Sequence, residues 1–239
     1  KWPDWKSAVT ELHHPKTQND LDPSTTARTR LAYDELLANQ LTLAIVRMKQ
    51  KKLNGRVFPT NGPLRKKLME TLPWPLTPYQ IEALKEIDED MASKNRMLRL
   101  LQGDVGSGKT IVAAAAMMNA IDGGCQTALM APTEILARQH TETLRPHLNS
   151  IGIHAVTLTG RDKGKIRQEI LDDISSGRAK IIIGTHALFQ EGVEFADLGL
   201  AVIDEQHRFG VHQRLQLSSK GKGVDILVMT ATPIPRTLA

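Results

Sequence analysis

The chain has 239 residues, of which 41% are hydrophobic and 24% charged, with a formal net charge of +5. This composition excludes a disordered or fibrous protein and is typical of a globular one with a substantial core. A single cysteine, Cys125, excludes an internal disulfide, and no apolar run is as long as a membrane span, so we expect a reducing, cytoplasmic location.

The first 72 residues predict a helical lead-in. Residues 1–24 are polar, with three prolines and no clear periodicity. Apolar residues spaced by three and four predict a helix over 27–52, and a second short helix over 63–71 has Asn61 as its expected cap.

The stretch 47–67 carries eight basic residues and no acidic one. Such a run can neutralise the phosphates of a nucleic acid, or it can simply solvate a helix and complement its dipole. The charge pattern alone does not decide between these two interpretations, and contact with nucleic acid is a hypothesis. The residues are Arg47, Lys49, Lys51, Lys52, Arg56, Arg65, Lys66 and Lys67.

Helices and strands alternate from Thr77 onward. A helix is predicted over 77–93, and the predicted strands are 97–102, 126–131, 154–159, 180–184, 199–203 and 225–230. Several strands are near-continuous apolar runs, which suit parallel strands buried on both faces. The expected fold is α/β, an open parallel sheet with helices on both faces after the helical lead-in.

Residues 103–110 follow the first predicted strand and fit the phosphate-binding pattern G-x-x-x-x-G-K-[ST]. Glycines let the backbone bring its N–H groups to phosphate oxygens, at the start of a helix that favours anions. Lys109 would contact the β- and γ-phosphates of a nucleoside triphosphate, and Thr110 would bind Mg²⁺. The predicted nucleotide-binding residues of this P-loop are Gly103, Asp104, Val105, Gly106, Ser107, Gly108, Lys109 and Thr110.

Asp204 and Glu205 end a later apolar strand. Such a pair often only starts a solvated helix. In a P-loop enzyme, however, an acid at this place holds Mg²⁺, usually through water, and its neighbour orients or deprotonates the attacking water. We therefore assign Asp204 to the metal and Glu205 to the water, with Lys109 as the third catalytic residue.

Gln80 allows two interpretations. Residues 77–80 fit the S/T-x-x-E/Q capping box, in which Gln80 only satisfies the backbone N–H of Thr77. Alternatively, its amide donates to and accepts from an adenine edge. The spacing alone favours the cap.

Three threonine-bearing segments, 131–134, 184–187 and 230–233, each follow a predicted strand. Their hydroxyl and N–H groups suit phosphate contacts that carry no sequence information, although helix capping explains each one separately. The candidates for nucleic-acid contact or coupling are Thr133, Thr185, Thr230 and Thr232, together with His207 after the acid pair.

In chain order, residues 103–110, 131–134, 204–207 and 230–232 resemble motifs I, Ia, II and III of superfamily 2 helicases. The longer runs 204–211 and 229–238, and 33–41 in the lead-in helix, resemble the branch-migrating bacterial DNA helicases of that superfamily. The nearest alternative is the transcription-repair coupling translocases. Gln206 and the lead-in helix favour the first group.

This resemblance implies an ATP-hydrolysing DNA helicase of repair and recombination, with ATP and Mg²⁺ as cofactors and branched DNA as partner. It implies a RecA-like lobe, and it makes Gln80 an expected adenine contact. It also implies a wedge domain before this segment and a second RecA-like lobe after it, which carries an arginine finger. We predict a lead-in over 1–72 and the first lobe over 73–239, and very slow ATP hydrolysis by these residues alone.

Overall fold

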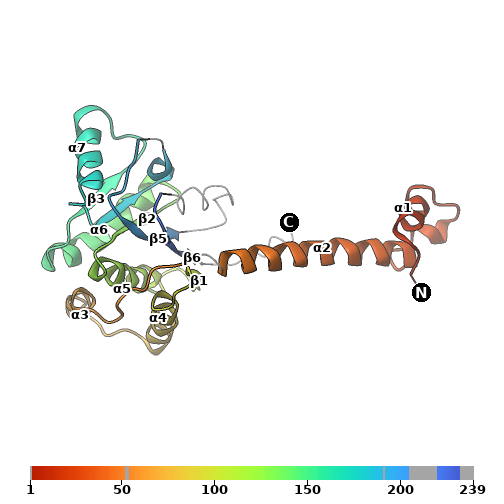
Figure 1. The fold of residues 1–239 in the computed structure, drawn as a ribbon, viewed down its shortest axis with the longest axis horizontal. Coiled ribbons are helices and arrows are strands. Elements are labelled where there is room, and N and C mark those ends of the chain that lie inside the picture. The colour runs from red at the N-terminus through yellow and green to blue at the C-terminus, as the bar shows by residue number, and fades with distance from the viewer. Residues whose placement is uncertain (1, 52–53, 191, 205–219, 232–239) are drawn as a thin grey trace. The chain divides into compact units, whose positions relative to one another are not determined.

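The computed structural model describes residues 2–51, 54–190, 192–204 and 220–231, and the chain forms two compact units, residues 1–52 and 53–239 (Figure 1). Unit 1 contains α1 (Trp5–His13), a 3₁₀ helix η1 (Gln18–Leu21) and α2 (Thr26–Lys51). The helix predicted over 27–52 is therefore present. None of the helices in the described ranges is both long and apolar enough to cross a bilayer.

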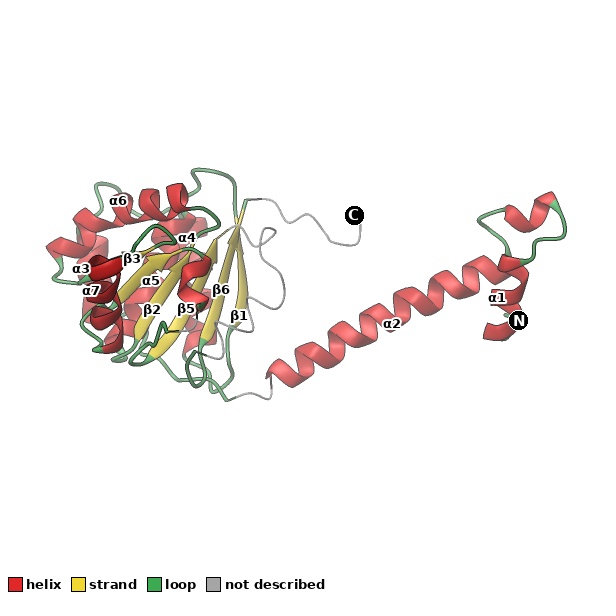
Figure 2. Cartoon of the chain, turned by 90° about the horizontal axis from the view of Figure 1, so that it is seen from above, coloured by secondary structure: helices red, strands yellow, loops and turns green. Residues whose placement is uncertain are grey.

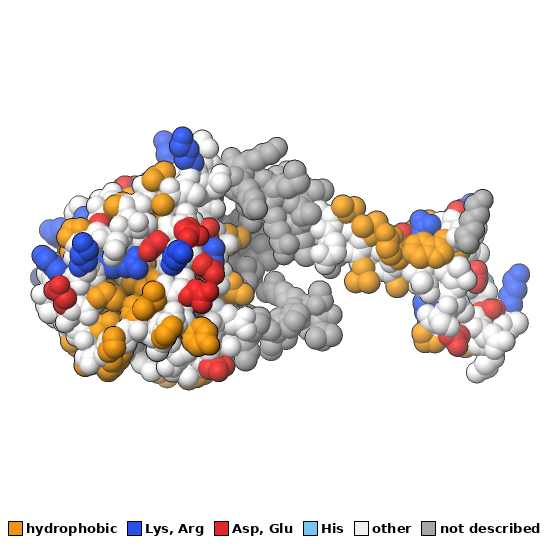
Figure 3. All heavy atoms as spheres, turned by 90° about the horizontal axis from the view of Figure 1, so that it is seen from below, with side chains coloured by type: hydrophobic (Ala, Val, Ile, Leu, Met, Phe, Trp, Pro, Cys, Tyr) orange, Lys and Arg blue, Asp and Glu red, His pale blue; other side chains and the backbone are white. Residues whose placement is uncertain are grey.

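Helix α1 lies in a segment where no helix was predicted. The carboxylate of Asp4 caps it by accepting hydrogen bonds from the backbone N–H and the hydroxyl of Ser7, at 3.0 and 2.6 Å. Ala8 is its only fully buried residue, but Trp5, Ala8, Val9 and Leu12 recur at spacings of three and four, so the sequence does contain the apolar face of this helix. Figure 3 shows apolar side chains on one face of unit 1. In this unit Trp5 and Leu36 are about 60% exposed.

Unit 2 is built around a parallel sheet of six described strands in the order β1-β6-β5-β2-β4-β3. The prediction of an open parallel sheet is confirmed, and every predicted strand agrees with the structure to within one residue at either end. Figure 2 shows the strands in yellow between their helices. The strands are β1 (Leu98–Gln102), β2 (Gln126–Met130), β3 (Ala155–Leu158), β4 (Ile181–Gly184), β5 (Leu198–Asp204) and β6 (Asp225–Thr230).

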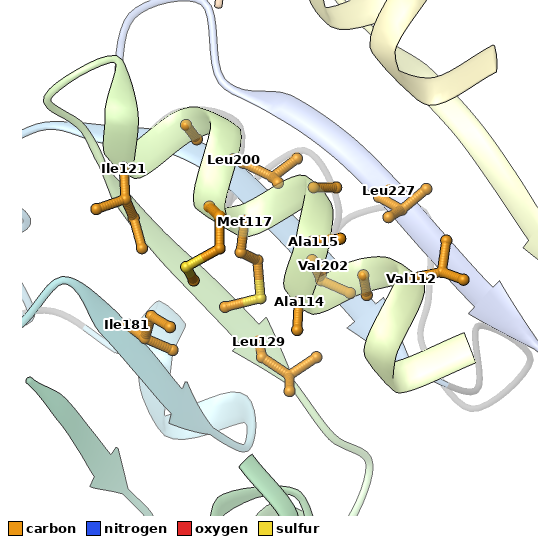
Figure 4. Close-up of a cluster of buried hydrophobic side chains, with 14 of the residues drawn as sticks. Val112, Ala114, Ala115, Met117, Ile121, Leu129, Ile181, Leu200, Val202 and Leu227 are labelled. Atoms are coloured by element: carbon orange, nitrogen blue, oxygen red, sulfur yellow. The ribbon is translucent and has the colours of Figure 1, made fainter. Parts of the chain in front are cut away.

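Helices cover both faces of this sheet, as expected. One face packs against α3 (Pro63–Glu70), α4 (Pro78–Met91), α5 (Lys109–Asp122) and α6 (Glu134–Ser150). The other packs against α7 (Gly164–Ser175) and the 3₁₀ helix η2 (His186–Phe189). Helix α5 is buried from Ile111 to Ile121 because it lies between the sheet and other helices. Figure 4 shows its side chains directed at those of β2, β4, β5 and β6.

Residues 54–72, which were predicted to belong to the lead-in, pack with unit 2. Leu68 of α3 is fully buried against the core that contains α5. The prediction that Asn61 caps α3 is wrong. Gly62 is the N-cap, Asn61 has a φ of 62°, and Asp122 at the end of α5 accepts from the backbone N–H of Leu64 at 3.3 Å. The cap is therefore supplied by another helix.

Two members of the basic stretch form ion pairs within unit 2. The two terminal guanidinium nitrogens of Arg56 donate to Asp197, at 2.6 and 2.8 Å. Arg65 donates to both carboxylate oxygens of Asp88, at 2.6 and 2.7 Å, and the buried amide of Asn119 donates to the same carboxylate at 2.8 Å. Asp88 therefore joins α3, α4 and α5.

Asp225, the first residue of β6, makes stability depend on pH. The residue is fully buried and accepts from the backbone N–H of Met97 at 2.8 Å. Burial raises the pKa of its carboxyl to about 7, against the partial opposition of that N–H and of the Arg96 charge. Between about pH 4 and 7 the folded state therefore holds a proton that the unfolded chain has lost. The stabilising contribution is complete below pH 4 and disappears as the pH rises through 7.

Asp225→Asn keeps an oxygen for Met97 and removes the ionisation. We expect the melting temperature of this variant, relative to the wild type, to rise from pH 5 to about pH 7 and to level off above it. Thermal unfolding of both proteins at each pH, followed by circular dichroism, measures this difference. A difference that stays constant over the range would contradict the assignment.

Candidate nucleotide site

The P-loop joins β1 to α5 at the carboxyl edge of the sheet. Gly106 and Gly108 both have a φ of 81°, a conformation that favours glycine, and Gly108 is the N-cap of α5. The N–H of Gly103 donates to the carbonyl of Thr230 at 3.2 Å, which ties the start of the loop to the end of β6. The N–H groups of Ile111 and Val112 donate to the carbonyl of Gly108, whereas those of Lys109 and Thr110 precede these first bonds of α5 and are available to an anion.

Lys109, the first residue of α5, holds its ammonium group across the loop. Its Nζ donates to the carbonyl oxygens of Gly103 and Asp104, the latter at 2.8 Å. These are neutral partners that a phosphate oxygen can replace with a stronger, charge-assisted bond. Val105 at the tip of the loop is 91% exposed, so the mouth of the site is open at this point.

Thr110 and Asp204 supply the oxygen donors expected for a metal. Thr110 lies in the first turn of α5 and Asp204 is the last residue of β5, with β6 between β1 and β5 in the sheet. The side chain of Asp204 is only 12% exposed. A hydroxyl and a carboxylate fit Mg²⁺, which takes few protein oxygens and completes its coordination with phosphate and water. Among the described residues, no group of three or more His, Cys, Asp or Glu side chains is placed to hold a metal.

A histidine that the sequence analysis did not select contacts Asp204. His140 of α6 has its Nε2 2.7 Å from Oδ2 of Asp204, and its side chain is 12% exposed. One feature of the sequence indicates that His140 faces the core. His140 lies three residues from Ala137 and four from Leu144, both fully buried, and so belongs to the face of α6 that packs on the core.

Gln80 forms the capping box that its spacing favours. Its backbone N–H donates to Oγ1 of Thr77 at 3.3 Å, and its Oε1 accepts from the Thr77 N–H at 2.9 Å. Its Nε2 also donates to the carbonyl of Ser107 in the P-loop, at 2.9 Å. A Cβ on Gly108 would collide with this amide. The residue therefore joins the start of α4 to the phosphate-binding loop, a contact that the capping pattern did not indicate.

The threonines at the strand ends lie on the same edge of the sheet. Thr133 caps α6 by accepting from the N–H of Leu136 at 3.3 Å, and Thr185 caps η2 by accepting from Ala187 at 3.5 Å. Thr230 is the last residue of β6 and is buried. Capping thus occurs at two of these positions, while their contact with nucleic acid stays a prediction. Glu205, His207 and Thr232 lie outside the described residues.

The sequence model of the DEAD/DEAH box helicase family matches residues 77–239. The chain is 47% identical over 242 residues to the ATP-dependent DNA helicase RecG of Pasteurella multocida (strain Pm70), with 98% of this chain and 35% of the relative covered. It is 46% identical over 242 residues to the Bacillus subtilis (strain 168) protein of the same name, with 100% and 35% covered. The chain thus spans about a third of the length of these curated relatives.

The solved structure of RecG bound to a three-way DNA junction matches with a TM-score of 0.74 and 44% identity, over 98% of this chain and 31% of that one. The DUF1998 helicase MrfA bound to DNA and AMPPNP matches with a TM-score of 0.57 and 19% identity over 77% of this chain and 28% of that one, which supports the fold alone. The predicted resemblance to branch-migrating bacterial helicases and the RecA-like fold are confirmed. The match to the DEAD/DEAH box helicase family implies that the protein uses a nucleotide. The chain belongs to the DEAD/DEAH box helicase family.

Proposed function

We propose that this chain contains the ATP-binding lobe of an ATP-driven DNA helicase that acts on branched DNA. The observation that carries the proposal is the meeting of two elements at one edge of the sheet. The P-loop follows β1, Asp204 ends β5, and β6 between them is hydrogen-bonded to the loop through Thr230 and Gly103. The chain is 46–47% identical to RecG proteins over nearly its whole length, which supports DNA as the nucleic acid on which this ATP hydrolysis acts.

Each predicted site residue has a role in this proposal. The backbone of 103–108 and Lys109 bind the triphosphate, and Thr110 and Asp204 hold Mg²⁺. When bound, Mg²⁺ supplies positive charge at the phosphates. Glu205 orients the attacking water. Gln80 binds the adenine edge. Its two bonds to Thr77 and Ser107 hold the amide beside the loop.

The DNA-facing residues belong to the segments that follow β2, β4, β5 and β6. Thr133, Thr185, Thr230 and Thr232 contact phosphates or relay the state of the nucleotide, together with His207. The remaining parts of a branched-DNA motor, a wedge domain and a second lobe, lie in the additional length of its relatives. The cytoplasmic location and the contact of stretch 47–67 with DNA stay predictions.

The test compares nucleic acids as activators of ATP hydrolysis in the full-length protein. We expect a three-way junction to stimulate turnover more than a linear duplex of the same composition, and RNA to stimulate it least. Strand separation is followed in parallel with a fluorophore and quencher on the junction arms. Equal stimulation by duplex and junction would indicate a double-stranded DNA translocase of the transcription-repair coupling type instead. ATP-dependent binding without strand separation would indicate a nucleotide-dependent binding module.

A further inference from the structure

Asp204, the proposed metal-binding carboxylate, has a buried partner from a different part of the fold. His140 comes from the second turn of α6, which follows β2, while Asp204 ends β5. The two side chains are 2.7 Å apart and each is 12% exposed. His140 is not one of the motif residues that define the proposed nucleotide site.

The direction of this hydrogen bond follows from its chemistry. A carboxylate oxygen accepts and does not donate, so the Nε2–H of His140 is the donor and Oδ2 of Asp204 the acceptor. The bond restricts rotation of the carboxylate about its χ2 angle, because leaving a buried donor unpaired is costly. His140 therefore determines which way the oxygens of Asp204 point.

Packing holds the part of α6 that carries His140. Ala137 and Leu144, on the same face of α6, are fully buried in the core. Thr141 donates to the carbonyl of Ala137 and is hydrogen-bonded to Thr157 of β3, both contacts under 3 Å. The part of α6 that carries His140 is thus held against the core, and the imidazole, 12% exposed, is bonded to Asp204. Since α6 begins at Thr133, a proposed DNA contact, the same helix carries both a DNA-facing end and the partner of the metal-binding acid.

We propose that His140 is a positioning residue that orients Asp204 for the metal–nucleotide complex and links that carboxylate to α6. The proposal rests on the proposed function, because it assumes that Asp204 holds Mg²⁺. Hydrogen-bonded partners of metal-binding groups tune affinity by fixing ligand orientation, and their loss commonly weakens metal binding by about 10- to 100-fold.

The test measures Mn²⁺, a paramagnetic substitute for Mg²⁺, by electron paramagnetic resonance in the full-length protein with a non-hydrolysable ATP analogue. We expect His140→Ala to weaken Mn²⁺ binding to the protein–nucleotide complex by about tenfold. His140→Gln is expected to recover most of the loss, because its Nε2 donates from a similar position. The Mg²⁺ concentration that half-activates ATP hydrolysis should rise in His140→Ala and return towards normal in His140→Gln.

Helix α6 offers a matched control in His147. Its Nδ1 is 2.8 Å from Oγ1 of Thr71, so His147→Ala removes a comparable hydrogen bond from the same helix, two turns further along. We expect His147→Ala to bind Mn²⁺ as the wild type does, even where its melting temperature falls as far as that of His140→Ala. This comparison separates a loss of packing from a loss of orientation.

Three results would overturn the proposal. They are wild-type Mn²⁺ affinity in a folded His140→Ala protein, equal weakening by His147→Ala, and no recovery in His140→Gln. Each leaves the proposed function intact, because the measurement requires neither DNA nor turnover. If the wild-type protein binds no Mn²⁺ with the analogue, the proposed function fails and this proposal fails with it.

Discussion

Lys109→Ala is expected to lower the kcat of ATP hydrolysis in the full-length protein by at least about 100-fold, the loss typical when one charge-stabilising donor is removed. Lys109 is the cation that the P-loop holds over its own carbonyls, on Gly103 and Asp104. With alanine in its place, the backbone N–H groups still bind phosphate, but the charge that develops during bond cleavage is uncompensated. Steady-state phosphate release with and without junction DNA measures the effect.

Lys85→Ala is the control for this variant. Lys85 lies exposed on α4, the helix that begins beside Gln80, so the change removes the same charge from the same lobe without altering the loop. Its turnover should equal that of the wild type. Lys109→Arg is expected to restore little, because a planar guanidinium does not fit the space of an ammonium point charge. Hydrolysis by Lys109→Ala at more than a tenth of the wild-type rate would refute the assignment of Lys109.

Asp88→Ala is expected to reduce the free energy of unfolding by about 3–5 kcal/mol, the cost of breaking a buried ion pair from one side. Asp88 accepts two bonds from Arg65 and one from the fully buried Asn119. The side chains of Arg65 and Asp88 are 11% and 18% exposed. Removing the carboxylate leaves a guanidinium and an amide with little access to water. Urea unfolding followed by circular dichroism gives the change.

Asp173→Ala provides the matched comparison. Asp173 on α7 also bonds an arginine and a second side chain, Arg178 and His154, but these partners are 66% and 54% exposed. Water replaces the lost carboxylate there, so the expected cost is about 1 kcal/mol or less. If Asp88→Ala costs no more than Asp173→Ala, the junction of α3, α4 and α5 does not depend on this carboxylate.

The strands and the P-loop could be predicted because their determinants are local. Buried parallel strands are continuous apolar runs, and the loop needs glycines where φ is positive, as at Gly106 and Gly108. Helix α1 was not predicted, although Asp4 caps it and Trp5, Ala8, Val9 and Leu12 have the spacing of a helix face, because this pattern covers only two turns among polar residues and prolines. The cap of α3 was misassigned because its acceptor, Asp122, comes from a helix about 60 residues later.

The contacts that refine the site depend on sheet order, which no local pattern contains. His140 meets Asp204 because β2 and β5 are neighbours, so the helix after β2 begins close to the end of β5. The capping role of Gln80 was visible in four consecutive residues. Its bond to Ser107, 27 residues away, requires the packing of α4 against α5. The glycine conformations of the P-loop and the capping box of Gln80 were therefore predictable, whereas the contacts of His140 with Asp204 and of Gln80 with Ser107 were not.

The sheet order also determines when the nucleotide site is completed during protein synthesis. Among the described strands, β1 pairs only with β6, so the strand that leads into the P-loop precedes its neighbour by more than 120 residues. At about 5–20 residues per second, β6 leaves the ribosome roughly 6–25 seconds after β1. Until then Gly103 lacks the Thr230 carbonyl that anchors it. The newly made chain therefore lacks this anchor of its phosphate-binding loop until β6, the last of the described strands, takes its place between β5 and β1.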